Sequence, residues 1–180
     1  MVALLNDLFG IQARGGCSCA GPYGHRLLGI DDARSREFQA EVARGWEGVK
    51  PGWARLNLNY FISDAEADFL VEAVALIARD GHRLLPDYRF DPLGGLWRHV
   101  AGVRPATRLS DLRLGADGSV GLPEPGRTVG EETLAGYLDE ARRTMSARPE
   151  PIDGEGLDLP PRFENLRWFV LPEICLEARF

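Results

Sequence analysis

The chain has 180 residues, a formal net charge of −6, 44% hydrophobic residues and 27% charged residues, and it contains three cysteines. These proportions are typical of a globular protein, and the length suits one domain or a small domain with an extension. The acidic balance argues against nucleic acid and anionic membranes as partners. There is no apolar run of the ~20 residues that cross a bilayer, no evident signal peptide and no secreted disulfide framework, so we expect a cytoplasmic protein.

The first predicted elements surround a glycine-rich stretch. Residues 1–9 carry apolar residues at helical spacing, and Gly10 follows as a stop; this helix begins without a cap, so we expect it to be cut short at its start. Residues 11–14 predict a short strand. Gly15 and Gly16 permit positive φ and close backbone approach, and Pro22 suits the first position of the next helix.

Cys17 and Cys19 lie between these glycines and that helix. Cys19 would lie just ahead of the helix N-terminus, whose partial positive charge favours a thiolate and lowers the pKa of the thiol. The alternative is a small buried residue in a glycine turn. Zinc binding by Cys17, Cys19 and His25 is a further alternative, although the C-x-C-x₅-H spacing offers no clear fourth ligand.

Two helices and a strand are predicted between residues 31 and 81. Asp31 and Asp32 cap a helix that we expect to reach about Gly48. Residues 53–59 alternate between apolar and polar side chains, as in a half-buried strand whose polar face, with Arg55, is free to line a cleft. Ser63 and Glu66 form a capping box ahead of a largely buried helix that ends near residue 81.

After residue 81 the pattern changes to short strands and turns. Hairpins are predicted over 88–98 and 112–122, and a capping box at Thr128 and Glu131 precedes a helix that extends to about Met145. Residues 148–161 are rich in proline, glycine and acidic residues and predict a loop, and 167–171 predict a last strand. The pattern indicates no function for this part.

Two motifs in the first part resemble the C-terminal small domain of class V aminotransferases and cysteine desulfurases, which are pyridoxal-phosphate (PLP) enzymes of fold type I. The first, from Arg14 to Ala20, matches that family's apolar strand, arginine, small residue, glycine, two residues, cysteine and alanine. The family has histidine at the two places where this chain has Cys17 and Ser18. The second, residues 50–70, matches a strand with arginine, an Asn-containing turn and a capped apolar helix.

The resemblance covers about residues 1–81 and implies roles for two residues. Cys19 takes the persulfide-forming, catalytic position, and Arg55 binds the α-carboxylate of an amino-acid substrate. We expect Arg14, on the neighbouring strand, to point toward the same cleft as a second substrate-binding residue. The family holds PLP as a Schiff base on a lysine. Lys50 is the only lysine and precedes the Pro51–Gly52 turn, which is not the family's lysine context, so we expect PLP in the complete enzyme but none on this chain alone.

We therefore expect an α+β fold. Residues 1–81 would form a small mixed or antiparallel sheet covered by helices, as in fold type I, and residues 82–180 a mixed α/β extension. The expected function is the C-terminal portion of a class V aminotransferase-like enzyme, inactive alone, with a large-domain partner or a homo-oligomer. The alternatives are a non-catalytic interaction module and a truncated remnant.

Overall fold

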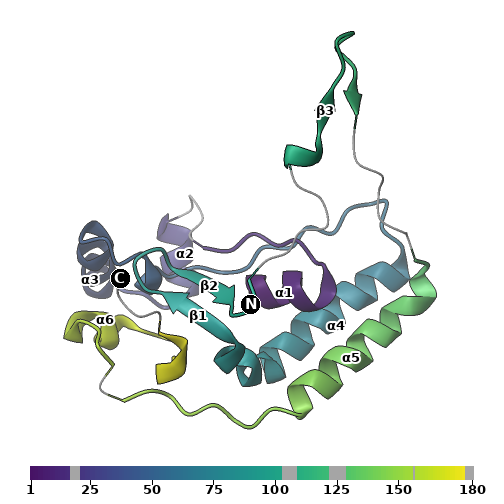
Figure 1. Cartoon of the computed structure of the whole chain (residues 1–180). Helices are drawn as coiled ribbons and strands as arrows, with labels where there is room; N and C mark the ends of the chain where they lie inside the picture. Colours follow the sequence, from purple (N-terminus) through teal and green to yellow (C-terminus); the bar gives the residue numbers. More distant parts are fainter. Residues whose placement is uncertain (17–20, 103–108, 122–128, 156, 177–180) are drawn as a thin grey trace.

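The computed structural model describes residues 1–16, 21–102, 109–121, 129–155 and 157–176. It confirms a mixture of helices with two small antiparallel sheets (Figure 1). The helices are α1 (Val2–Phe9), α2 (Gly21–Leu27), α3 (Asp32–Ala43), α4 (Asp64–Asp80), α5 (Leu134–Ser146) and α6 (Pro161–Leu166). The strands are β1 (Tyr88–Asp91), β2 (Leu96–His99), β3 (Arg113–Leu114) and β4 (Val120–Gly121). Short 3₁₀ turns are η1 (Glu47–Val49), η2 (Gly81–Asp87), η3 (Leu109–Asp111), η4 (Glu131–Thr133) and η5 (Glu173–Cys175).

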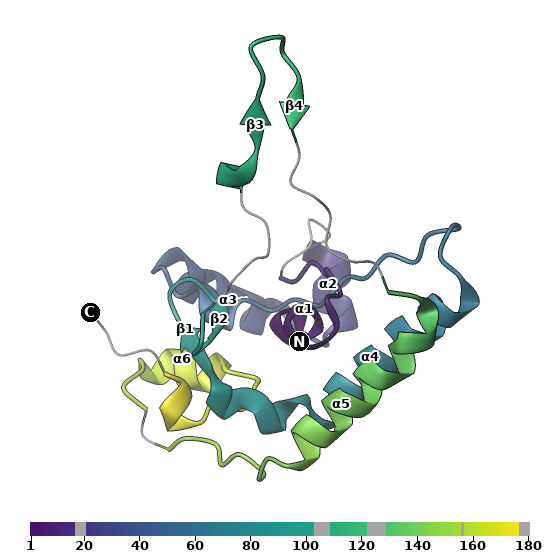
Figure 2. The ribbon, with the colours of Figure 1, turned by 45° about the vertical axis from the view of Figure 1, so that its right-hand side comes forward.

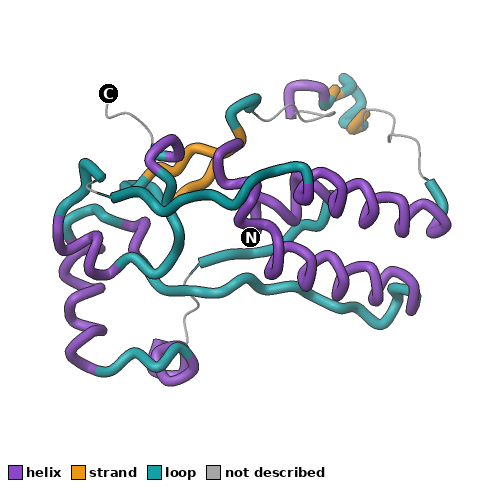
Figure 3. The backbone as a smooth tube through the Cα atoms, turned by 90° about the horizontal axis from the view of Figure 1, so that it is seen from below, coloured by secondary structure: helices purple, strands orange, loops and turns teal. Residues whose placement is uncertain are grey.

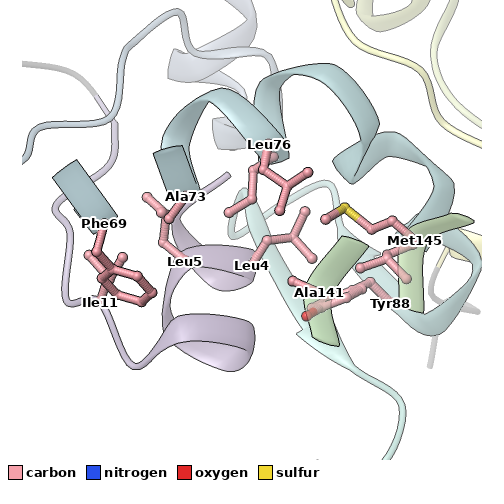
Figure 4. Packing of buried hydrophobic residues seen from close by; sticks show 11 residues of the cluster. Leu4, Leu5, Ile11, Phe69, Ala73, Leu76, Tyr88, Ala141 and Met145 are labelled. Atoms are coloured by element: carbon pink, nitrogen blue, oxygen red, sulfur yellow. The ribbon is translucent and has the colours of Figure 1, made fainter. Parts of the chain in front are cut away.

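Helices α1, α4 and α5 pack around the first hydrophobic cluster (Figure 4). The predicted capping box is present, because Ser63 Oγ accepts from Glu66 N–H (3.1 Å) and Glu66 Oε2 accepts from Ser63 N–H (2.9 Å). α1 ends at Gly10, as predicted, with a left-handed φ of 64°. The buried members of the cluster are Leu4, Leu5, Ile11, Phe69, Ala73, Leu76, Ile77, Leu84, Tyr88, Ala141 and Met145.

A second cluster joins α3, β1, α6 and the last turn, η5, at the other end of the molecule (Figure 2). Its buried members are Phe38, Val49, Phe90, Leu157, Leu159, Phe163, Leu166, Leu171 and Cys175. Trp97 of β2 packs against both clusters. Each cluster combines residues from before and after residue 81, so the predicted parts 1–81 and 82–180 share their packing.

The hairpin of β3 and β4 stands away from the rest of the chain (Figures 1 and 2). Its register pairs Arg113 with Gly121 and Leu114 with Val120. Leu114 and Val120 lie on one face of this hairpin and are 81% and 58% exposed. The β1–β2 hairpin is packed instead, with Phe90 opposite Trp97. Both predicted hairpins are confirmed in position within the described residues.

The sheet predicted within residues 1–81 is wrong in extent. Neither 11–14 nor 53–59 forms a strand; the two segments meet at a single antiparallel bridge between Arg14 and Arg55. In this antiparallel pairing, residues 53–59 would lie opposite residues 16–10. Gly10 (φ 64°) and Gly16 (φ 103°) both adopt positive φ, so the partner segment is extended only between them and the ladder stays short. The alternation of buried and exposed side chains also stops at Leu58, which is 57% exposed.

Two further predictions are corrected by local interactions. The helix predicted to reach Gly48 ends at Ala43, because Gly45 adopts a left-handed φ of 95° before η1. Residues 167–171 form no strand, since Leu171 N–H donates to the Asp153 carboxylate (2.8 Å) instead of to a neighbouring strand. α6 precedes this stretch and has no counterpart among the predicted elements, although Pro161 suits its first turn.

Helix α5 starts later than its predicted capping box. Thr128 lies outside the described residues, and η4 occupies the position of the expected first turn. The Thr133 hydroxyl donates to the Gly130 carbonyl (2.8 Å), and α5 begins at Leu134. Across the described residues, no helix combines the length and the apolar character needed to cross a bilayer.

Candidate functional site

The structure brings Arg14 and Arg55 together. Arg14 N–H donates to the Arg55 carbonyl (3.1 Å), and Arg55 N–H donates to the Arg14 carbonyl (2.7 Å). This mutual exchange is the hydrogen-bonded pair of an antiparallel ladder, in which Cα atoms lie about 5.5 Å apart and the side chains leave on the same face. Figure 3 shows the two loops running side by side between the helices. Both arginines are exposed.

Glycines set the spacing of the two loops. A Cβ on Gly52 would lie 2.5 Å from the carbonyl carbon and oxygen of Gly16, so the backbones are in direct contact there. Gly15 is held as closely by the Val2 side chain, which would lie 2.8 Å from an added Cβ. The positive φ and the close backbone approach that these glycines permit are both present at Gly16, whereas Gly15 contacts a side chain. Gly52 is the residue that Gly16 contacts. The sequence indicated Gly52 only as part of a turn and did not predict this contact.

Helix α2 packs against the loop that carries Arg55. A Cβ on Gly24 would lie 2.8 Å from the Trp53 ring, so the indole packs against the helix backbone. Trp53 N–H also points to the Gly16 carbonyl (3.4 Å). His25 is partly buried on this short helix, and its carbonyl accepts from Ile30 N–H (2.8 Å). The arginine pair, the glycine contacts and the start of α2 thus form one structural unit.

The electrostatics of the pair favour an anion. Like charges directly opposite each other on one face of an antiparallel pair are destabilising. A carboxylate between two guanidinium groups reverses that repulsion and can accept hydrogen bonds from both forks. The pair is therefore a candidate anion site.

The predicted catalytic residue, Cys19, lies outside the described residues, as does Cys17. The zinc alternative rests on these two thiols and His25, so it stays a prediction as well. Within the parts of the chain that the structure describes, no three His, Cys, Asp or Glu side chains gather as metal ligands would. Cys175 is fully buried in the second cluster, where its thiol donates to the Leu85 carbonyl (3.1 Å), and this location is structural.

Lys50 does not fit a cofactor site. Its Nζ lies 3.0 Å from Glu47 Oε2 in a half-exposed ion pair at the end of η1. A Schiff-base lysine needs an enclosed site with groups that hold the cofactor phosphate and ring. Lys50 is exposed and paired with a carboxylate instead, so no chemical step is assigned to this residue.

Comparison of the chain with protein-family models, with curated proteins and with solved structures found no match. The relation to class V aminotransferases therefore stays a prediction from the two sequence motifs.

Proposed function

We propose that this chain provides the substrate-carboxylate site of a PLP-dependent enzyme of the class V aminotransferase and cysteine desulfurase type. The substrate class is an α-amino acid. The cofactor and its lysine belong to a polypeptide segment other than residues 1–180, because Lys50 does not fit that role.

The pairing of Arg14 with Arg55 carries this proposal. The two residues lie 41 positions apart in the sequence, in separate motifs that both resemble the same family. Their hydrogen-bonded bridge sets both side chains on one exposed face. Arg55 would hold the carboxylate through two parallel N–H···O bonds, and Arg14 would add charge and a further donor. Cys19 follows Arg14 by five residues and remains the proposed reactive thiol.

Carboxylate binding tests the proposal without the cofactor. Acetate and L-alanine are titrated into the ¹⁵N-labelled chain at constant ionic strength, and the arginine Nε–H signals are followed by NMR. We expect saturable shifts with a Kd in the millimolar range, of order 4 kcal/mol of binding free energy. Arg55→Gln should weaken binding about tenfold or more, and Arg14→Gln by a smaller factor, since removing a charged partner costs about 1.5–3 kcal/mol.

Arg36→Gln is the matched control, because Arg36 is an exposed arginine on α3, outside the bridge. It should leave the affinity unchanged. Circular dichroism of each variant separates loss of the site from loss of the fold. The same weak, non-saturating response in the wild type and in all three variants would overturn the carboxylate site and, with it, the proposed function.

The second candidate function is a non-catalytic interaction module. It is favoured by the loop between the Arg55 segment and α4, where Tyr60 and Phe61 are 99% and 71% exposed and meet edge to face (ring centroids 5.5 Å apart). Exposed aromatic residues are enriched at protein–protein interfaces. A chain that binds no carboxylate but loses a partner when Tyr60 and Phe61 are changed to serine would support this candidate.

A further inference from the structure

A groove of about 510 Å³ lies between the first turns of α4 and α5. Phe69 and Val71 of α4 and Leu134 and Leu138 of α5 supply its apolar lining. Val71 is 62% exposed, so this apolar surface is open at the side of α4. Figure 1 shows α4 and α5 side by side along most of their length.

The rim of this groove is acidic. Asp68 of α4 and Glu131 of η4 line it, and both are exposed. Glu72 also lines it but is engaged within the chain, since its carboxylate accepts from the Arg142 guanidinium (2.7 Å). The groove thus combines an apolar lining with two carboxylates that face solvent. Such a surface fits a helix with large apolar side chains one turn apart and a positive charge beside them.

Helix α2 of this same chain has that chemistry on its outer face. Tyr23 and Leu27 are one helical turn apart and are 61% and 60% exposed. Arg26 is exposed on the same turn, and the helix sequence contains no acidic residue. The contact of Gly24 with Trp53 holds α2 on the body of the protein from another side, so this face is presented to the outside.

We propose that the chain self-associates by placing α2 of one copy in the α4–α5 groove of a second copy. Tyr23 and Leu27 would cover the apolar lining, and Arg26 would lie between Asp68 and Glu131. A single short helix buries less than the ~800 Å² per partner of a stable interface. A two-fold pair repeats the contact, because each copy contributes one helix and one groove. The interface uses neither Arg14 nor Arg55 and is independent of the proposed function.

Sedimentation velocity over a concentration series, from about 10 µM to about 1 mM, tests this interface. The wild type should pass from monomer to dimer, and added salt should shift the transition to higher concentration, because the rim charges are exposed. Arg26→Glu and Asp68→Arg should each raise the midpoint concentration about tenfold or more. The combined variant Arg26→Glu/Asp68→Arg restores opposite charges and should recover most of the association.

Arg36→Glu carries the same charge change as Arg26→Glu on a surface outside the interface and should leave the midpoint unchanged; paired with Asp68→Arg it should not rescue. Glu131→Arg replaces Asp68→Arg if that variant does not fold by circular dichroism. The proposal is overturned if the wild type stays monomeric throughout, or if it dimerises with the same midpoint in every charge variant. A dimer that loses affinity only when Leu114 is changed to serine would assign the interface to the β3–β4 hairpin instead.

Discussion

The chemistry of single residues in this chain depends on how deeply they are buried. Cys175 is fully buried, and this burial raises the pKa of its thiol to about 11, although the charge of Arg89 opposes the shift. Tyr88 is also buried; loss of hydration and the hydrogen bond from its hydroxyl to the Asp7 carboxylate (2.7 Å) raise the pKa of the phenol. Both groups are neutral donors at physiological pH and belong to the packing.

The thiols should therefore differ in reactivity. With brief iodoacetamide treatment near pH 8, Cys175 should remain unmodified in the folded chain, because the thiolate is the nucleophile and this thiol is both protonated and inaccessible. Cys19, if the start of α2 lowers the pKa of its thiol, should react before Cys17. Peptide mass spectrometry gives the order of labelling, and a control in urea should label all three. Fast labelling of Cys175 in the native chain would contradict its buried environment.

Alkaline pH should destabilise the fold through Cys175. The raised folded-state pKa means that the thiol's contribution is complete below pH 9, its ordinary pKa, and is lost as the pH rises toward 11. Urea unfolding at pH 8 and at pH 10.5 should show the decrease, and Cys175→Ala should remove part of it. The remaining decrease belongs to Tyr88, whose contribution is lost on the same side of the pH scale. A pH-independent free energy of unfolding would exclude both contributions.

At the scale of elements, the two loops that carry Arg14 and Arg55 depend on the backbone contact between Gly52 and Gly16. Gly52→Ala places a methyl group against the Gly16 carbonyl. A flexible side chain could turn aside, but this contact is with backbone, so the loop itself must shift. We expect a loss of about 1–3 kcal/mol in the free energy of unfolding, as for other overpacked sites, and weaker carboxylate binding. Urea unfolding and the NMR titration measure the two effects.

Gly136→Ala is the control for this change. Gly136 lies inside α5, and an added Cβ meets nothing within 4 Å. The same substitution should there stabilise the chain by about 0.5–1 kcal/mol through helix propensity. If both substitutions changed the free energy of unfolding by the same amount, the close contact between Gly52 and Gly16 would not be needed for stability.

Helix α4 is the element whose start depends most clearly on its cap. Ser63→Ala removes the hydroxyl that accepts from Glu66 N–H and should cost about 1 kcal/mol. Ser35→Ala, within α3, should change the free energy of unfolding by less than about 0.5 kcal/mol. Thermal unfolding by circular dichroism compares the two, and an equal effect would show that the capping box contributes little to α4.

The whole molecule is joined by packing across residue 81. Met145 of α5 is fully buried in the cluster that also holds Leu4 and Leu5 of α1. Met145→Ala should cost about 2–5 kcal/mol, because it leaves a cavity among these residues. Ser146→Ala, an exposed neighbour, serves as the control.

The unfolding of Met145→Ala also tests whether the two parts are independent. Trp97 packs against both clusters, so we expect tryptophan fluorescence and far-ultraviolet circular dichroism to report one coincident transition. Two separated transitions, with only the later one displaced by the substitution, would show that residues 1–81 fold as a separate domain.

Local chemistry within the sequence determined the end of α1, the starts of α3 and α4, and both hairpins. Gly10, the Asp31 cap and the Ser63–Glu66 box each act within four residues, and so the pattern of neighbouring residues was sufficient to predict them. The glycines next to Arg14 likewise predicted a close backbone approach. These interactions do not require the remote partner to be known.

The tertiary structure alone decided the extent of the strands and the surfaces. The pattern at residues 53–59 has the period of a strand, but a strand needs a partner that stays extended, and the facing segment 10–16 begins and ends at glycines with positive φ. Arg167 and Asp153 form an ion pair (2.9 Å) where a last strand was predicted. The α4–α5 groove joins residues 65–72 to residues 131–138. No local pattern indicates such a juxtaposition, because hydrophobic periodicity shows which face is apolar but not what covers it.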